Sequence, residues 1–226
     1  MAGARNKSAL IAGATGLVGV RCLARLLEHT AYDRVTVLSR RPIAMSHAKL
    51  HVELVDFDAL RSLGEHCDDL FCCIGTTIRK AGSQEAFRRV DHDYPLALAR
   101  LAKTQGAQQF LLVSALGADA HSSVFYSRVK GEVERDIAAI GLPKVSFMRP
   151  SILLGERYER RPGERAGIFV GKLIAPVLLG PLRKYRPIHA DDVAAAMLYV
   201  ANHNVRPGPV DSDQIAWLAQ RENAAT

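Results

Sequence analysis

The sequence predicts an α/β fold, a doubly wound parallel sheet of six or seven strands with helices on both faces. Two observations predict it. Short apolar runs alternate with segments of helical periodicity along most of the 226 residues. The first such run, residues 9–12, ends in glycines spaced three apart, and a helical pattern follows them directly. Strands of a parallel sheet are buried on both faces, which is why they read as continuous apolar runs.

The predicted elements follow one another as such a sheet requires. Strands are predicted at residues 8–12, 34–39, 51–56, 69–75, 109–114 and 145–150. Helices are predicted at residues 17–28, 83–90, 91–105, 126–140 and 191–201, with a last short one after residue 211. Alternating strands and helices imply right-handed crossovers. We expect one domain over 1–226, in which 151–187 and 203–226 form a small C-terminal lobe covering the substrate side.

The composition is that of an ordinary globular protein, with 48% hydrophobic and 23% charged residues. These values argue against a disordered or a fibrous chain. The net charge of +7 fits either a polyanionic partner or a basic loop beside a site for a phosphate-rich ligand. No basic stripe interleaved with aromatic residues accompanies the charge, so the second reading is favoured and no nucleic-acid partner is expected.

The four cysteines predict the redox environment. Cys72 and Cys73 are adjacent inside an apolar run, and neither Cys22 nor Cys67 completes a C-x-x-C pair. Such residues are expected to be buried free thiols of a reducing compartment. The sequence shows no secretory signal pattern and no run of about 18 apolar residues. We therefore expect a cytoplasmic location.

Gly13, Gly16 and Gly19 form the most informative stretch of the sequence. They stand between a strand and a helix, an arrangement that presents backbone N–H groups to a phosphate. Gly13 would permit the sharp turn, Gly16 the close approach of a pyrophosphate, and Gly19 the packing of helix on strand. The alternative is a turn that uses glycine for packing alone.

Ser39, Arg40 and Arg41 end the second predicted strand. In dinucleotide-binding units an acidic residue here holds a ribose 2′-hydroxyl, whereas arginine accommodates a 2′-phosphate. Two cations and a hydroxyl suit a phosphate monoester, so NADP(H) is expected rather than NAD(H). The alternative is an exposed basic turn.

Two further strand ends are expected beside the cofactor, because ligands of doubly wound sheets lie beyond the carboxyl ends of the strands. Asp56 and Phe57 would border the adenine. Gly75, Thr76 and Thr77 would pass close under the cofactor.

Ser114, Tyr126 and Lys130 are the candidate catalytic residues. Tyr126 and Lys130 lie four apart and share a helix face, so the ammonium can lie near the phenol. A neighbouring cation is expected to lower the tyrosine pKa and make the phenol a usable general acid. Ser114, at the end of its strand, would hydrogen-bond the carbonyl oxygen of a substrate.

Residues 157–186 are basic and then apolar, and they leave three interpretations open. Arg157, Arg160, Arg161 and Arg165 precede the apolar segment 168–182, which contains a lysine and two prolines. It could cover the substrate cleft, form a dimer surface, or contact a membrane surface; cleft cover is favoured over membrane contact. His47 and His51 lie in a loop entering a strand, so no metal site is expected.

As a set, the motifs of this chain resemble the atypical, extended-like branch of the short-chain dehydrogenase/reductase superfamily, and within it the Tat-interacting protein family of NADP-binding oxidoreductase-like proteins. The resemblance runs from Ser8 to about Val200. It is carried by Gly13-Ala-Thr-Gly-Leu-Val-Gly19, Ser39-Arg-Arg41, Gly75-Thr-Thr77, Lys80-Ala-Gly-Ser83, Glu85-Ala-Phe87, Val113-Ser114, Gly117-Ala-Asp119, Phe125-Tyr126, Lys130-Gly-Glu-Val-Glu134 and Arg149-Pro150.

This resemblance implies a Rossmann-like fold with NADP(H) along the strand ends. By position, it implies pyrophosphate contacts from Gly13, Thr15, Gly16, Leu17, Val18 and Gly19. It implies contacts to the adenosine phosphate from Ser39, Arg40 and Arg41, to the adenine from Asp56 and Phe57, and to the ribose from Gly75, Thr76 and Thr77. Near the nicotinamide it implies Ser114, Tyr126, Lys130, Pro150 and Ile152. Cys73-Ile-Gly-Thr stands where ordinary members have Asn-Ala-Gly, so a proton relay through asparagine is not carried over.

Together these observations predict an NADP(H)-dependent oxidoreductase acting on a small carbonyl or alcohol, with Tyr126 as general acid/base. The alternative is an NADP(H)-binding regulatory module that contacts another protein and has little turnover. We expect a small-molecule substrate and a monomer or homodimer.

Overall fold

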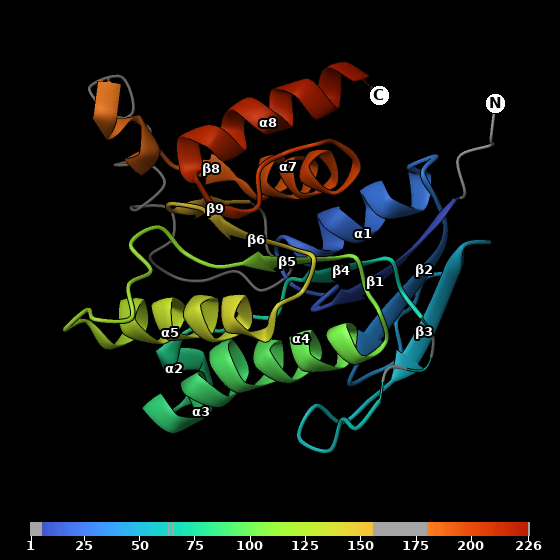
Figure 1. Cartoon of the computed structure of the whole chain (residues 1–226), viewed down its shortest axis with the longest axis horizontal. Helices are drawn as coiled ribbons and strands as arrows, with labels where there is room; N and C mark the ends of the chain where they lie inside the picture. Colours follow the sequence, from blue (N-terminus) through green and yellow to red (C-terminus); the bar gives the residue numbers. More distant parts are fainter. Residues whose placement is uncertain (1–5, 63, 65, 156–179, 226) are drawn as a thin grey trace.

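A seven-stranded parallel sheet lies between two layers of helices in the computed structural model, which describes residues 6–62, 64, 66–155 and 180–225 (Figure 1). The strand order is β3-β2-β1-β4-β5-β6-β9. The strands are β1 (Lys7–Ala12), β2 (Tyr32–Ser39), β3 (Leu50–Leu54), β4 (Asp69–Cys72), β5 (Gln109–Val113), β6 (Lys144–Arg149) and β9 (Gly208–Asp211). Every pairing is parallel, which confirms the predicted fold class.

The helices divide between the two faces of the sheet (Figure 1). One layer holds α1 (Gly19–Glu28), α7 (Ala190–Asn202) and α8 (Ser212–Ala225). The other holds α4 (Tyr94–Thr104) and α5 (Phe125–Ile140), with the short helices α2 (Ile78–Ala81) and α3 (Gln84–Arg88) beside them. Each layer closes its own hydrophobic core over the sheet. None of the described helices is long and apolar enough to cross a membrane.

Helix α1 shows how the sequence pattern becomes packing. Cys22, Leu23, Leu26 and Leu27 recur on one face and are all buried against the sheet and α7. Because α1 begins directly after the glycine turn, this burial also fixes the position of that turn.

The two helices predicted at 83–90 and 91–105 form one longer helical segment that a π turn interrupts. A π turn, Arg89–Asp93, joins α3 to α4. Such a turn contains one residue more than a regular helical turn and changes which side chains face inward. In consequence Asp91 and His92 are both buried, although they are adjacent in the sequence.

The C-terminal part differs from the predicted lobe in its arrangement. Residues 203–226 supply the edge strand β9 of the main sheet and helix α8, which packs on α7. In the stretch 151–187, β7 (Leu153–Leu154) pairs with β8 (Ile188–His189), which follows the stretch directly, and a 3-10 turn spans Gly180–Tyr185. Most of the basic and apolar segment 157–186, including Arg157, Arg160, Arg161 and Arg165, lies outside the described residues. Its role as a cover stays a prediction.

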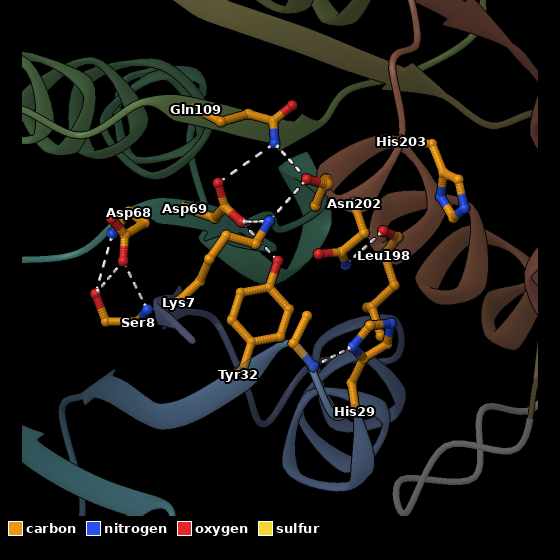
Figure 2. A network of polar contacts seen from close by, with 12 residues as sticks. Lys7, Ser8, His29, Tyr32, Asp68, Asp69, Gln109, Leu198, Asn202 and His203 are labelled. Atoms are coloured by element: carbon orange, nitrogen blue, oxygen red, sulfur yellow. Dashed lines mark hydrogen bonds and ion pairs between the residues drawn. The ribbon is translucent and has the colours of Figure 1, made fainter. Parts of the chain in front are cut away.

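At the amino ends of the strands, a buried polar network joins β1, β2, β4 and β5 (Figure 2). The carboxylate of Asp69 accepts hydrogen bonds from the Lys7 ammonium and the Tyr32 hydroxyl, both at 2.6 Å, and from the Gln109 amide at 3.4 Å. Lys7 also donates to the carbonyl of Ala201 at the end of α7, at 2.9 Å. This end of the sheet is therefore closed by side chains that bond one another.

Candidate cofactor and active site

Two of the three glycines in the turn between β1 and α1 are required by the fold. Gly13 has a φ of +83°, and a Cβ there would lie 2.6 Å from the backbone of Cys73. A Cβ at Gly19 would lie 2.0 Å from the Gly13 carbonyl oxygen. Gly16 is different: it is exposed, and its nearest obstacle is that same oxygen at 3.2 Å. Gly16 is thus the glycine that leaves the turn open to a ligand.

The start of α1 fits a phosphate group. Val18 occupies the N-cap position without a side-chain hydrogen bond, and the first turn contains no acidic residue. The helix dipole there favours an anion, although the Val20 and Arg21 N–H groups already donate to the carbonyls of Gly16 and Val18. Thr15 is exposed beside the turn, and Leu17 is half-buried against Gly155. The Val18 side chain is buried in the core, so only its backbone can face a pyrophosphate.

The end of β2 presents two cations to solvent. Arg40 and Arg41 are exposed, and the Ser39 hydroxyl donates to the Arg41 carbonyl at 2.7 Å. The hydroxyl therefore shapes the turn that carries the arginines. Beyond β3, Asp56 is exposed, and the Phe57 ring lies 5.5 Å from the Tyr94 ring, centroid to centroid.

The segment after β4 is tied to the π turn. The Thr76 N–H donates to Asp91 Oδ2 at 2.8 Å, and Thr77 Oγ1 accepts from the Lys80 N–H at 3.2 Å, which caps α2. Gly75 is exposed, and a Cβ there would lie 3.4 Å from Asp91 Oδ1. The backbone of this segment therefore runs directly over the Asp91 carboxylate.

Tyr126 and Lys130 lie on the first two turns of α5 but in different environments. The Tyr126 side chain is 37% exposed, and its ring lies 5.6 Å from that of Phe87. Lys130 is 4% exposed, and its Nζ lies 2.8 Å from Asp91 Oδ1. Burial works against the charge of Lys130, but the interactions with Asp91 and Tyr126 outweigh it and raise the pKa of the lysine. The ammonium is therefore retained inside the protein.

Ser114 closes β5, and its hydroxyl is already engaged. It is buried and donates to the carboxylate of Glu134, which also accepts from Arg149 Nε at 3.0 Å. The predicted donation from Ser114 to a substrate carbonyl would require this bond to break. Nearby, Pro150 is buried and its carbonyl accepts from the Leu116 N–H, whereas Ile152 is exposed.

Sequence reasoning missed the three charged residues that hold this site together: Asp91, Glu134 and Arg149. Glu134 carried a usable signal, because it follows Lys130 by four residues and so shares its helix face. No sequence signal pointed to Asp91, because its carboxylate faces α5 only as a result of the π turn. Within the described part of the chain no group of three or more His, Cys, Asp or Glu side chains could hold a metal ion, and all four cysteines are free thiols.

The sequence profile of the NAD dependent epimerase/dehydratase family matches residues 9–211. The chain belongs to this family. Among curated relatives, Protein HTATIP2 of Rattus norvegicus is 41% identical over 166 residues, which are 71% of this chain and 68% of that protein. Protein FMP52, mitochondrial, of Eremothecium gossypii is 34% identical over 224 residues, which are 96% of this chain and 99% of that protein.

Solved structures of this family share the fold. The human epimerase family protein SDR39U1 (isoform 2), solved with NADPH, has a TM-score of 0.57 at 20% identity, covering 90% of this chain and 74% of that one. MoeE5 in complex with UDP-glucuronic acid and NAD has a TM-score of 0.65 at 18% identity, covering 89% and 74%. The chain is thus an atypical short-chain dehydrogenase/reductase that resembles HTATIP2, with an NAD(P)-binding Rossmann-like fold.

The expected cytoplasmic location is wrong. Several of the curated family relatives, proteins FMP52 from different fungi, are named mitochondrial. Free thiols indicate a reducing environment. They do not identify the compartment that provides it.

Proposed function

We propose that this family member is an NADP(H)-dependent oxidoreductase that acts on a small carbonyl or alcohol, with Tyr126 as its general acid/base. The observation that carries the proposal is the arrangement on α5. A partly exposed phenol lies one turn before a buried ammonium, which is held by Asp91 next to the segment that follows β4. All of these groups lie at the carboxyl ends of the strands, where such sheets bind their ligands.

The chain's own residues fit the cofactor. Gly13, Gly16, Gly19 and the backbone of Leu17 and Val18 would hold the pyrophosphate at the start of α1, with Thr15 beside them. Asp56 and Phe57 would border the adenine; Gly75, Thr76 and Thr77 would lie along the ribose; Pro150 and Ile152 would line the nicotinamide end. The bound nicotinamide supplies or accepts the hydride.

The protein's part in the reaction is orientation and a proton. As general acid, the Tyr126 phenol gives its proton to the oxygen of the reduced carbonyl. The charged Lys130 favours the phenolate that remains. Ser114, bonded to Glu134, would fix the depth at which a substrate sits beside Tyr126.

The test is a Tyr126→Phe variant assayed with NADPH against a panel of small aldehydes and ketones. We expect turnover to fall about 10²- to 10⁴-fold, since that is what general acid–base catalysis contributes, while the affinity for NADPH stays the same. Tyr185→Phe is the matched control, because it removes the hydroxyl of another exposed tyrosine, in the 3-10 turn. Full turnover in Tyr126→Phe would overturn the mechanism. Tight NADPH binding without turnover of any panel member by the wild type would favour the alternative, a cofactor-dependent regulatory module.

The preference for NADP(H) rests on Arg40 and Arg41, which are exposed at the end of β2 and have no acidic residue next to them in the sequence. Replacing both by alanine removes the charge-assisted bonds to a 2′-phosphate, so NADPH affinity should fall about 10- to 100-fold while NADH affinity stays unchanged. Titration of each variant with both cofactors measures this. Equal losses for the two cofactors would show that the arginines form only a basic turn.

The relatives named mitochondrial support a mitochondrial location for this chain as well. Fractionation of cells that express the tagged protein would test it. Recovery with mitochondrial markers is the expected result, and recovery with cytosolic markers alone would contradict it.

A further inference from the structure

The π turn that joins α3 to α4 aims one carboxylate at two parts of the candidate site. Asp91 is buried, with 1% of its residue surface exposed. Its Oδ2 accepts the Thr76 N–H at 2.8 Å, and its Oδ1 lies 2.8 Å from Lys130 Nζ. One side chain thus connects the segment after β4 with the lysine on α5. π turns are rare and are frequently found at functional sites.

Two flanking contacts hold the π turn against α5. The Arg88 guanidinium pairs with the Glu132 carboxylate. On the other side, His92 Nε2 lies 2.9 Å from Asp136 Oδ2. Asp91 lies between these contacts in the chain, so its position relative to Lys130 is fixed from both sides.

Gly75 lies next to this pair. It is exposed, and a Cβ there would lie 3.4 Å from Asp91 Oδ1 and 4.0 Å from Lys130 Nζ. A glycine backbone therefore covers the pair at the carboxyl end of β4. Any ligand that runs along this backbone lies close to the charges beneath it.

The charge of Lys130 depends on its surroundings. The groups that face its ammonium are the Asp91 carboxylate from the π turn, the Tyr126 phenol from its own helix and the Cys72 thiol from β4. Burial opposes the charge, and Asp91 is the main group that offsets it, with the result that the pKa of Lys130 is raised. Without the Asp91 carboxylate, burial would favour the neutral amine.

We propose that Asp91 is a positioning residue of this site: one carboxylate oxygen keeps Lys130 charged beside Tyr126, and the other fixes the Thr76 backbone at the ribose side of the cofactor. Asp91 touches neither substrate nor cofactor in this role and acts through Lys130 and Thr76. The inference builds on the proposed function, because a charged lysine matters for the reaction only if Tyr126 transfers a proton.

The first test measures Lys130 directly and needs no substrate. Side-chain NMR of the isotopically labelled full chain follows the protonation of Lys130 Nζ against pH in wild type, Asp91→Asn and Asp91→Glu. Asparagine retains an acceptor for the Thr76 N–H but loses the charge. We expect the proton affinity of Lys130 to fall about tenfold or more in Asp91→Asn, and Asp91→Glu to restore most of it. An unchanged Lys130 titration in Asp91→Asn would overturn the proposal.

The matched control is Asp93→Asn. It removes the same charge from the same π turn, but its carboxylate lies 2.7 Å from His92 Nδ1 and does not pair with Lys130. The Lys130 titration should stay unchanged in this variant. A shift as large as that of Asp91→Asn would mean that any loss of charge in the π turn has the same effect, which contradicts a specific role for Asp91.

The second test uses turnover of the holoenzyme. In Asp91→Asn we expect kcat to fall with its pH profile displaced, while KM and the affinity for NADPH change less than about threefold, because the contacts to ligands remain. A fall that is equal at all pH values would contradict the proposal. If the wild type turns nothing over, the proposed oxidoreductase fails, and the Lys130 titration still decides the role of Asp91.

A double variant covers the case in which Asp91→Asn folds poorly. Asp91→Asn combined with Lys130→Met removes both charges, so no unpaired ammonium stays buried. If Asp91 acts through Lys130, the double variant will have a higher Tm than Asp91→Asn alone and the same kcat as Lys130→Met alone. If the losses in Tm and in kcat were each the sum of the losses in the two single variants, Asp91 and Lys130 would act independently, and the proposal would be overturned.

Discussion

The two ends of the sheet each contain a lysine–aspartate pair with a buried carboxylate, and the pairs differ in what surrounds them. At the amino end, Asp69 bonds Lys7 and Tyr32, both at 2.6 Å, as well as Gln109 (Figure 2). At the carboxyl end, Lys130 lies 2.8 Å from Asp91, one helical turn after an exposed phenol. The first pair is closed by its neighbours. The second lies beside the exposed Gly75 backbone at the carboxyl end of β4.

The tyrosines beside these pairs make the difference plain. Tyr32 is 0% exposed, and burial followed by the influence of Asp69 raises its phenol pKa well above the usual value, so it serves only as a neutral donor. Tyr126 is 37% exposed and lies beside a lysine that keeps its charge. The same residue types therefore bond one another in a closed network at one end, whereas at the other the phenol is partly exposed, where we propose that it transfers a proton.

Gly13→Ala gives the largest expected effect. It tests a position at which the division into a stabilising end and a ligand-binding end should fail, because this glycine is required by the fold and also belongs to the proposed cofactor site. The new Cβ would lie 2.6 Å from the Cys73 backbone at a φ of +83°. Overpacking together with left-handed strain should lower the free energy of unfolding by about 4 kcal/mol and abolish NADPH binding. Chemical denaturation and cofactor titration measure the two effects.

Gly82→Ala is the control for this substitution. Gly82 has a φ of +90°, yet nothing lies within 4 Å of a Cβ built there. Only the strain of the left-handed backbone remains, so we expect the free energy of unfolding to fall by about 1 kcal/mol and NADPH binding to stay intact. Equal losses for the two glycines would mean that the contact with Cys73 is unimportant.

Asp69→Asn comes next and tests the claim that the amino end serves stability alone. It leaves the Lys7 ammonium without its carboxylate in a buried network, for which we expect a loss of about 3 kcal/mol in the free energy of unfolding. NADPH affinity should stay unchanged at temperatures where the variant is folded. Asp68→Asn is the control: its carboxylate accepts from the Ser8 N–H at 2.8 Å, and an asparagine oxygen can still do so. A loss of cofactor affinity in Asp69→Asn would show that the two ends are coupled.

Much of this arrangement could be predicted from the sequence, because backbone requirements and burial leave local traces. Gly13 and Gly19 stand where no Cβ fits, and continuous apolar runs mark the buried strands. Tyr126 and Lys130 could be paired because four residues separate neighbours on a helix face.

Other features depend on contacts between distant segments, for which a single sequence has no local sign. Asp91 reaches Lys130 only because a π turn interrupts the helix before α4. Lys7 meets Asp69 only because β1 and β4 are neighbours in the sheet, although β2 and β3 lie between them in the chain. The Ser114–Glu134 bond is an intermediate case, because spacing places Glu134 on the helix face of Lys130 but does not show that it meets the end of β5.

Tyr32→Phe sharpens the contrast between the two tyrosines. It removes a hydroxyl that donates to Asp69 at 2.6 Å in a fully buried position, so the free energy of unfolding should fall by about 1 to 2 kcal/mol. NADPH binding and turnover should not change. Tyr126→Phe should do the reverse, with an unchanged Tm and reduced turnover. Loss of turnover in Tyr32→Phe, measured well below its Tm, would contradict the division between the two ends.

The smallest expected effect comes from a third ion pair, which is half-exposed. Asp191, in the first turn of α7, accepts from Arg25 Nε at 3.1 Å and Nη2 at 2.7 Å. The hydrogen bond from Arg25 lowers the pKa of Asp191, so the pair stabilises the folded state above about pH 4 and loses this contribution as the pH falls further.

Half of the Asp191 side chain is exposed, which limits the contribution to about 0.5 kcal/mol. Asp191→Asn should therefore leave Tm nearly unchanged at pH 7 and slightly flatten the fall of Tm below about pH 4. If Asp191→Asn lowered the stability at pH 7 as much as Asp69→Asn, exposure of the carboxylate would not explain why the two pairs differ. The contribution of the network at the amino end would then have a cause other than burial.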